Sequence, residues 1–174
     1  MNKTTLILGG ARSGKSSYAL SLAKKYKKVA FVATCQGLDK EMCHRIKLHQ
    51  EARPKHWQTF EEPKELAELL GKKHSFDCIL IDCLTLWVSN LVLAGNSQKQ
   101  IIEKVQELLL ILNKNKARVI LVSNEVGLGL VPANKLGREF RDIAGIANQV
   151  VASKANEVMF MVAGLPMIIK GKVN

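Results

Sequence analysis

The feature that most constrains this chain is a glycine-rich segment at residues 9–16, GGARSGKS, which directly follows an apolar run. It matches the phosphate-binding pattern G-x-x-x-x-G-K-[ST], which requires a strand before it and a helix after it. Both conditions are met, because residues 4–8 have a strand-like pattern and residues 17–25 are compatible with a helix. A chance glycine-rich turn would not explain the complete motif in this context. The segment therefore predicts a binding site for a nucleoside triphosphate.

Each residue type in this loop has a chemical task. Gly9 and Gly14 permit backbone angles and close approaches that a Cβ atom would block, so N–H groups can converge on phosphate oxygens at a helix N-terminus. Lys15 supplies positive charge to the β- and γ-phosphates, and Ser16 supplies a hydroxyl for Mg²⁺. The predicted phosphate-binding residues are Gly9, Gly10, Ala11, Arg12, Ser13, Gly14, Lys15 and Ser16.

The rest of the chain alternates between strand-like and helix-like segments. Continuous apolar runs, which are typical of strands covered on both faces, occupy residues 29–35, 76–82 and 118–122. Helical periodicity marks residues 38–53, 64–70, 84–94, 98–113 and 135–156. Residues 54–63 are expected to form a loop, and residues 157–162 and 167–170 a hairpin. This order predicts an α/β fold, a P-loop NTPase-type three-layer sandwich with a mainly parallel sheet and a C-terminal β-hairpin, in a single domain over residues 1–174.

An acidic residue ends one of the predicted strands. Residues 76–82 are an apolar run closed by Asp82, the pattern in which a carboxylate reaches the Mg²⁺ held by the P-loop serine. A simple turn acid at a strand end is the alternative. The position of this run after a P-loop favours a metal-binding role for the acid, so Ser16 and Asp82 are the predicted metal ligands.

The helix predicted at residues 38–53 has an unusual charge pattern. Arg45, His49 and Arg53 follow one another at i, i+4 spacing, so one face is basic with a histidine at its centre. Spacing alone favours an ordinary surface histidine. Near cations, a neutral imidazole would nevertheless be a competent nucleophile toward a phosphorus atom.

Charge and hydropathy restrict the partners. The formal net charge of +11 attracts anionic partners of any kind. The lysine-rich segment 24–28 lacks interleaved aromatic residues for base stacking, so nucleic-acid binding is not expected. No apolar run approaches the ~20 residues that span a bilayer, and the P-loop strand leaves no room for a signal peptide. A cytoplasmic protein without membrane insertion is expected.

Three classes of P-loop protein fit so far: a small-molecule phosphotransferase, an ATPase acting on nucleic acid, and a regulatory nucleotide switch. The switch class reads guanine with an Asn-Lys-x-Asp segment, and residues 134–137, NKLG, lack the acid. A nucleic-acid motor usually carries an added domain. A small-molecule enzyme is therefore the favoured class.

Segments outside the P-loop are more specific than the P-loop itself. The chain resembles the bifunctional adenosylcobinamide kinase/adenosylcobinamide-phosphate guanylyltransferase family over nearly its whole length. The matching segments are residues 9–16, 33–34, 45–46, His49, 53–54, 56–57, 82–85, 90–91, 123–127, 131–132, 140–145 and 148–149.

The resemblance implies two reactions in the assembly of coenzyme B12. In the first, the aminopropanol hydroxyl of adenosylcobinamide is phosphorylated by ATP or GTP. In the second, GMP is transferred from GTP to that phosphate through a guanylylated histidine, which by resemblance is His49. A kinase with only the first activity remains an alternative.

The resemblance also implies a set of site residues and partners. His49 and Lys15 are the implied catalytic residues, and Mg²⁺ is the implied cofactor. Adenosylcobinamide and its phosphate are the implied acceptors, and a homotrimer is the implied assembly. Beyond the P-loop, the implied nucleotide-binding residues are Ala33, Thr34, Cys35, Gln50, Glu51, Ala52, Arg53, Glu61 and Asp82.

Overall fold

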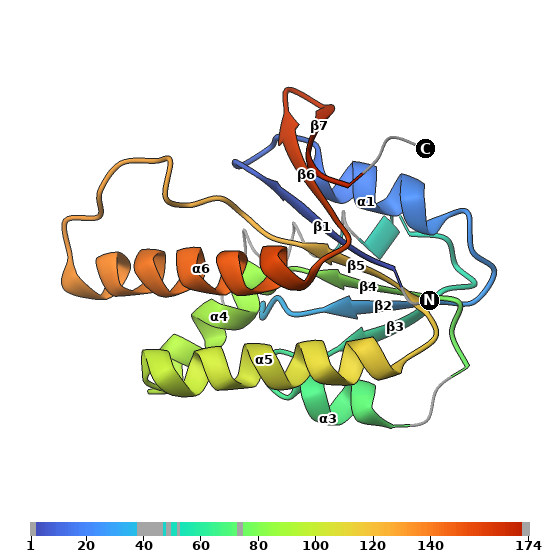
Figure 1. Cartoon of the computed structure of the whole chain (residues 1–174), viewed down its shortest axis with the longest axis horizontal. Helices are drawn as coiled ribbons and strands as arrows, with labels where there is room; N and C mark the ends of the chain where they lie inside the picture. Colours follow the sequence, from blue (N-terminus) through green and yellow to red (C-terminus); the bar gives the residue numbers. More distant parts are fainter. Residues whose placement is uncertain (1–2, 38–46, 48–49, 52, 73–74, 172–174) are drawn as a thin grey trace.

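The computed structural model describes residues 3–37, 47, 50–51, 53–72 and 75–171, and Figure 1 shows the whole chain. Its centre is a seven-stranded sheet with the order β3-β2-β4-β5-β1-β6-β7. The strands are β1 (Thr4–Gly9), β2 (Val29–Ala33), β3 (Gln58–Glu61), β4 (Cys78–Asp82), β5 (Arg118–Val122), β6 (Glu157–Val162) and β7 (Leu165–Lys170). All neighbours pair in parallel except β6 and β7, which form an antiparallel hairpin.

Helices cover both faces of the sheet (Figure 1). The helix α1 (Lys15–Ala23) packs on one face, where its Ala19 and Ala23 join Ile7, Phe31 and other strand residues in one core cluster. The opposite face carries α3 (Leu66–Gly71), α4 (Leu84–Leu93), α5 (Gln98–Lys114) and α6 (Lys135–Lys154). Because successive strand residues point to opposite faces, Leu6 belongs to this second cluster and Ile7 to the first. The predicted three-layer α/β sandwich is confirmed.

Local sequence explains where the long helices begin and how they pack. At α5, the Ser97 side chain accepts from the N–H of Gln100, and the Gln100 side chain reaches back to the Ser97 N–H, which completes a capping box. At α6, the Asn134 side chain caps the N–H of Gly137. Both helices bury a single apolar stripe, which in α6 includes Ile143, Ala144 and Val151.

One predicted segment was wrong. Residues 54–63 were expected to form a loop, but Gln58–Glu61 is the edge strand β3, paired with β2. An edge strand need not be apolar. In β3 only Phe60 is partly buried, so the sequence contains no hydrophobic run that would predict this strand. Most of the helix predicted at residues 38–53 lies outside the described residues, although residues 47, 50 and 51 are helical.

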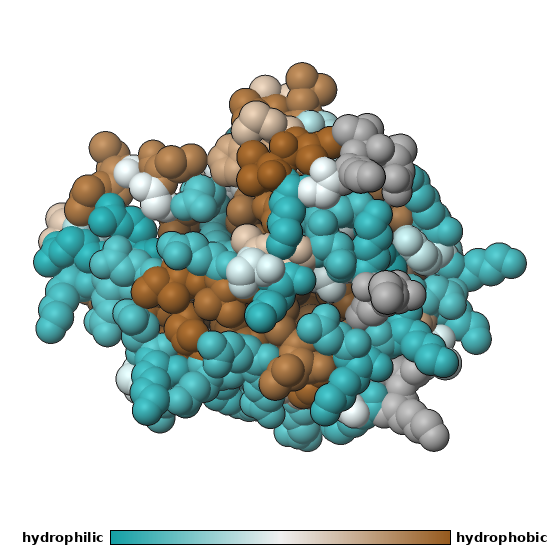
Figure 2. Space-filling model, in the orientation of Figure 1, coloured by the Kyte–Doolittle hydropathy of each residue, from teal (hydrophilic) through white to brown (hydrophobic). Residues whose placement is uncertain are grey.

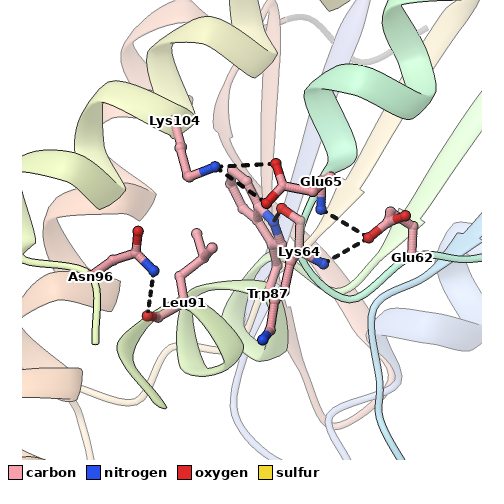
Figure 3. A network of polar contacts seen from close by, with 7 residues as sticks. All are labelled: Glu62, Lys64, Glu65, Trp87, Leu91, Asn96 and Lys104. Atoms are coloured by element: carbon pink, nitrogen blue, oxygen red, sulfur yellow. Dashed lines mark hydrogen bonds and ion pairs between the residues drawn. The ribbon is translucent and has the colours of Figure 1, made fainter. Parts of the chain in front are cut away.

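The segment between β3 and α3 is fastened to the helical layer beneath it (Figure 3). The Glu62 carboxylate accepts from the backbone N–H groups of Lys64 and Glu65 at 3.0 and 2.8 Å. The indole N–H of Trp87 on α4 donates to the Lys64 carbonyl at 2.7 Å, and Lys104 on α5 pairs with Glu65 at 3.2 Å. These contacts hold the end of β3 at the same sheet edge as the P-loop.

Candidate functional site

The six parallel strands end at one edge of the sheet, where open α/β sheets bind ligands. A cavity of about 1090 Å³ lies along this edge. It is large enough for a nucleotide and part of a second substrate, since ligand cavities span roughly 300–1,000 Å³. Its lining consists of Ala11, Arg12, Ser13, Gly14, Lys15, Ser16, Ser17, Ala33, Cys35, Gln36, Gly37, Gln50, Arg53, Glu61, Pro63, Asp82, Cys83, Leu86, Val122 and Asn124.

The P-loop connects β1 to α1, and two of its glycines are required by space as well as by backbone angle. At Gly9, with φ 150°, a Cβ atom would lie 2.7 Å from the Met161 carbonyl oxygen on β6. At Gly14, with φ 93°, it would lie 3.0 Å from Cα of Gly164 in the β6–β7 turn. The Gly164 N–H also donates to the Ser13 carbonyl at 3.0 Å. The C-terminal hairpin therefore supports the phosphate-binding loop from behind.

Lys15 is the buried cation of the loop, with 7% of its surface exposed. Its ammonium donates to the Gly10 carbonyl at 2.5 Å. Burial lowers the pKa of Lys15 because desolvation disfavours the charged form, and electrostatic interactions with Cys83 and Asp82 only partly oppose this effect. A bound polyphosphate would supply the counter-charge that this desolvated ammonium lacks.

Asp82, at the end of β4, also lines the cavity, and the chain around it is tightly held. Cys83 donates its N–H to the Thr34 hydroxyl at 2.8 Å, and that hydroxyl donates to the Cys83 carbonyl at 2.7 Å. The Asn90 amide on α4 donates to the carbonyls of Thr34 and Pro63 at 2.8 and 3.0 Å. The strand ends that carry Asp82 and Glu61 are thereby fixed relative to each other.

A second cation reaches the cavity opposite the P-loop. The guanidinium carbon of Arg53 lies 3.6 Å from the ring centroid of Phe31, in cation–π contact. Its Nε and Nη1 are buried and have no hydrogen-bond partner among the described residues. Burial lowers the pKa of Arg53, and Asp82 and Glu61 oppose this. Gln50 reaches the same wall, where it donates to Glu61 at 3.2 Å.

A closed ring of hydrogen bonds fixes the end of β5. The Asn124 N–H donates to the Thr85 hydroxyl at 2.5 Å, which leaves that hydroxyl free to donate to Ser123 at 2.9 Å. Ser123 donates to Asn148 on α6 at 2.7 Å, and the Asn148 amide donates to the Asn124 carbonyl at 3.2 Å. Polar groups that are buried in such a satisfied ring rigidify the chain that they join.

The structure brings together most of the predicted nucleotide-binding residues. Those in the cavity wall are Ala11, Arg12, Ser13, Gly14, Lys15, Ser16, Ala33, Cys35, Gln50, Arg53, Glu61 and Asp82. Among the described residues, Gly9, Gly10, Thr34 and Glu51 lie outside the wall; Gly10 bonds Lys15, and Thr34 braces Cys83. His49 and Ala52 are outside the described residues.

Sequence reasoning missed several residues of the wall, among them Asn124. The available signal was its place in the loop two residues after the buried strand β5, whereas Asp82 was singled out as the acid that ends its own strand. The segments at residues 83–85, 90 and 123–124 carried the family resemblance without a role. Thr85, Asn90 and Ser123 prove to be buried braces of the strand ends.

Comparison with known proteins decides the family. The family described as "Cobinamide kinase / cobinamide phosphate guanyltransferase" matches residues 5–169. The chain belongs to this family. The bifunctional adenosylcobalamin biosynthesis protein CobP of Pseudomonas aeruginosa is 47% identical over 169 residues, covering 96% of this chain and 97% of that protein. CobU of Escherichia coli, with the same description, is 40% identical over 178 residues, covering 95% and 98%.

These findings confirm the predicted kinase and guanylyltransferase roles in cobinamide metabolism, with ATP or GTP as substrates. The crystal structure of the RadB recombinase has a TM-score of 0.53 and 19% identity, over 91% of this chain and 73% of that one. At this identity the likeness concerns the P-loop NTPase fold alone. Among the described helices, none combines the length and the apolar character that a membrane crossing needs.

Proposed function

We propose that the cavity at the P-loop edge is where this family member carries out both reactions, first on adenosylcobinamide and then on its phosphate. The observation that carries the proposal is the composition of the wall: it contains Lys15 of the P-loop, which follows β1, together with Arg53 and Gln50, which contact Phe31 of β2 and Glu61 of β3. The P-loop side suits the β- and γ-phosphates of a nucleotide. Gln50 lines the cavity and directly follows His49 in the sequence, which supports a role for His49 in the same site.

In the kinase reaction, the acceptor hydroxyl oxygen forms a bond to the γ-phosphorus. The bond from that phosphorus to the β,γ-bridging oxygen breaks, the nucleoside diphosphate leaves, and the hydroxyl proton passes to water. Lys15 and the loop N–H groups neutralise the charge on the transferred group. Such a transfer depends mainly on positioning and charge, so no strong base is required.

In the guanylyltransferase reaction, we propose that an imidazole nitrogen of His49 forms a bond to the α-phosphorus of GTP, and pyrophosphate leaves. A phosphate oxygen of adenosylcobinamide phosphate then attacks the same phosphorus, and the bond to the imidazole breaks. Two successive steps replace one direct displacement between two anions. Arg53 is proposed to balance charge on the α-phosphate, with its unpartnered N–H groups as donors.

The donor set also fits the predicted Mg²⁺. The Ser16 hydroxyl and the Asp82 carboxylate both line the cavity, and Mg²⁺ in nucleotide sites takes one or two such oxygens and completes its shell with phosphates and water. Bound there, the ion would neutralise charge on the β- and γ-phosphates. Ser16 and Asp82 would hold it between them.

Exposed apolar residues support the homotrimer that the family resemblance implies. The β6–β7 hairpin exposes Leu165, Ile169, Met167 and Val162, with Leu165 73% exposed, and Figure 2 shows this apolar surface at the top of the molecule. Uncovered edge strands with apolar side chains tend to pair with another chain. Light scattering after gel filtration should give a trimer mass, and the double substitution L165D/I169K should give a monomer. A monomeric wild type would refute this assembly.

Labelled GTP tests the covalent step. GTP labelled at the α-phosphate should leave an acid-labile, base-stable label on the protein, and GTP labelled at the γ-phosphate should not. His49→Ala should abolish the label. His56→Ala, which removes an exposed histidine of the same chain, is the matched control and should keep it. Labelling of His49→Ala at the wild-type level would refute the assignment of the nucleophile.

A further inference from the structure

Asn124 follows β5, the strand that lies between the P-loop strand β1 and the strand β4 that carries Asp82. In the sheet, β5 is placed between β1, which leads into the P-loop, and β4, which ends at Asp82. Residues that follow β5 therefore emerge between Lys15 and Asp82. This is where the outermost phosphate of a P-loop nucleotide is held.

The alternation of side chains directs Asn124 into the cavity. Val122 belongs to the core cluster on the α1 face. Ser123 turns to the opposite face, where its hydroxyl contacts Thr85 of α4 and Asn148 of α6. Side chains alternate along an extended chain, so Asn124 returns to the α1 side. Val122 and Asn124 both line the cavity, and Ser123 does not.

The backbone of Asn124 is fixed while its side chain is available. Its N–H and its carbonyl are both held in the hydrogen-bonded ring with Thr85 and Asn148. No described residue forms a hydrogen bond with its side-chain amide. A polar group in a cavity wall, held by a rigid backbone and without a protein partner, has the properties of a preorganised ligand-binding donor.

We propose that the side-chain amide of Asn124 donates a hydrogen bond to a γ-phosphoryl oxygen and positions this group for transfer in the kinase reaction. The inference rests on the proposed function of the cavity. As the acceptor oxygen bonds to the γ-phosphorus and the bond to the β,γ-bridging oxygen breaks, charge spreads over the three outer oxygens. A donor already aimed at one of them stabilises this distribution without reorganising.

The two reactions of the enzyme separate this role from a structural one. Guanylyl transfer breaks the bond between the α-phosphorus and the α,β-bridging oxygen, so the γ-phosphoryl group only leaves as part of pyrophosphate. Asn124 therefore contributes much less to that reaction. A residue that merely shaped the cavity would affect both reactions alike.

The experiment compares Asn124→Ala, Asn124→Asp and the control Asn113→Ala, which removes an exposed asparagine of α5. In Asn124→Ala, kcat for phosphorylation of the corrinoid should fall by about 100-fold, with KM for the nucleotide changed less than about 3-fold. Labelling by GTP with a tagged α-phosphate should change less than about 3-fold. Asn124→Asp should be at least as impaired as Asn124→Ala in the kinase reaction, because a carboxylate has no N–H donor and repels phosphate. Asn113→Ala should match the wild type.

The outcomes separate failure of this role from failure of the proposed function. Equal losses in both reactions, an unimpaired Asn124→Ala, or a kinase-active Asn124→Asp would each overturn the role of Asn124. Thermal melting should give the same Tm for all variants, because the ring uses the backbone of residue 124 and not its side chain; a large fall in Tm would indicate a structural role instead. A wild type that lacks both reactions would refute the proposed function itself.

Discussion

Buried charged side chains at the two edges of the sheet differ in how completely other side chains compensate them. At the edge where the strands begin, Glu157 of β6 accepts hydrogen bonds from Thr5 at 2.7 Å and from Arg118 at 2.5 Å, and it forms an ion pair with Lys3. At the edge where the strands end, burial lowers the pKa of both Lys15 and Arg53, and two buried nitrogens of Arg53 have no described hydrogen-bond partner.

This difference indicates which edge of the sheet binds a charged ligand. Removing a charge from water is costly unless a partner compensates it. Within the chain, Glu157 is compensated: burial raises its pKa, but the hydrogen bonds from Lys3, Thr5 and Arg118 outweigh this and bring it down to about 2. Lys15 and Arg53 are compensated only in part. Substitutions at the first edge should therefore cost stability, and substitutions at the second should cost function.

The largest expected effect is that of Lys15→Met. Both reactions should slow by at least about 1000-fold, because the phosphates lose their buried counter-charge. The free energy of unfolding should not fall by more than about 1 kcal/mol, since a desolvated ammonium contributes little to stability. Single-turnover assays and urea unfolding measure the two quantities. Lys27→Met, at an exposed lysine, is the control for the loss of one positive charge. A strongly destabilised Lys15→Met would contradict the division between the two edges.

Glu157→Gln should give the opposite result. The neutral amide leaves Arg118, whose side chain is only 16% exposed, without its charged partner. Breaking a buried pair in this way costs about 3 kcal/mol, which urea unfolding at neutral pH would detect. The kcat of the folded variant should stay within about 2-fold of the wild type for both reactions. A selective loss of activity at full stability would show that this edge also serves the site.

The same carboxylate predicts how acid affects the fold. The folded pKa of Glu157, about 2, lies below its ordinary value of 4.5, so its contribution is present above pH 4.5 and disappears as the pH falls toward 2. A shift of this size corresponds to about 3 kcal/mol. The difference in unfolding free energy between the wild type and Glu157→Gln should therefore shrink between pH 5 and pH 2. A difference that stayed constant through this range would rule out the ionised carboxylate as its source.

Much of this arrangement could be predicted from the sequence, and the exceptions have physical reasons. The P-loop and the buried strands were readable because their patterns are local. The edge strand β3 was missed because only Phe60 of its four residues packs against the core. Asp82 could be placed from its strand, whereas Asn124 could not, since its importance follows from the order of the strands. His49 was assigned by family resemblance, because spacing alone left it an ordinary surface histidine.

The smallest effects are expected from one arginine-to-lysine substitution at each edge, and this pair directly compares the two edges. Lysine keeps the charge of arginine but loses the planar fork that stacks on a ring and forms several hydrogen bonds at once. Arg53→Lys should raise KM for the nucleotide by about 10-fold, because the stacking on Phe31 and the donors toward the phosphate are lost, while the free energy of unfolding stays within about 0.5 kcal/mol.

Arg118→Lys is its counterpart, because Arg118 bonds both Thr5 and Glu157 through one nitrogen at the opposite edge. This variant should lose about 1–2 kcal/mol of unfolding free energy, with KM for the nucleotide unchanged. Urea unfolding and initial-rate kinetics measure the unfolding free energy and the KM of each variant. Arg53→Lys should change KM but not stability, and Arg118→Lys should change stability but not KM. If both variants lost stability and affinity together, the charges at the two edges would belong to one coupled network, and the division of the sheet into a structural edge and a binding edge would be wrong.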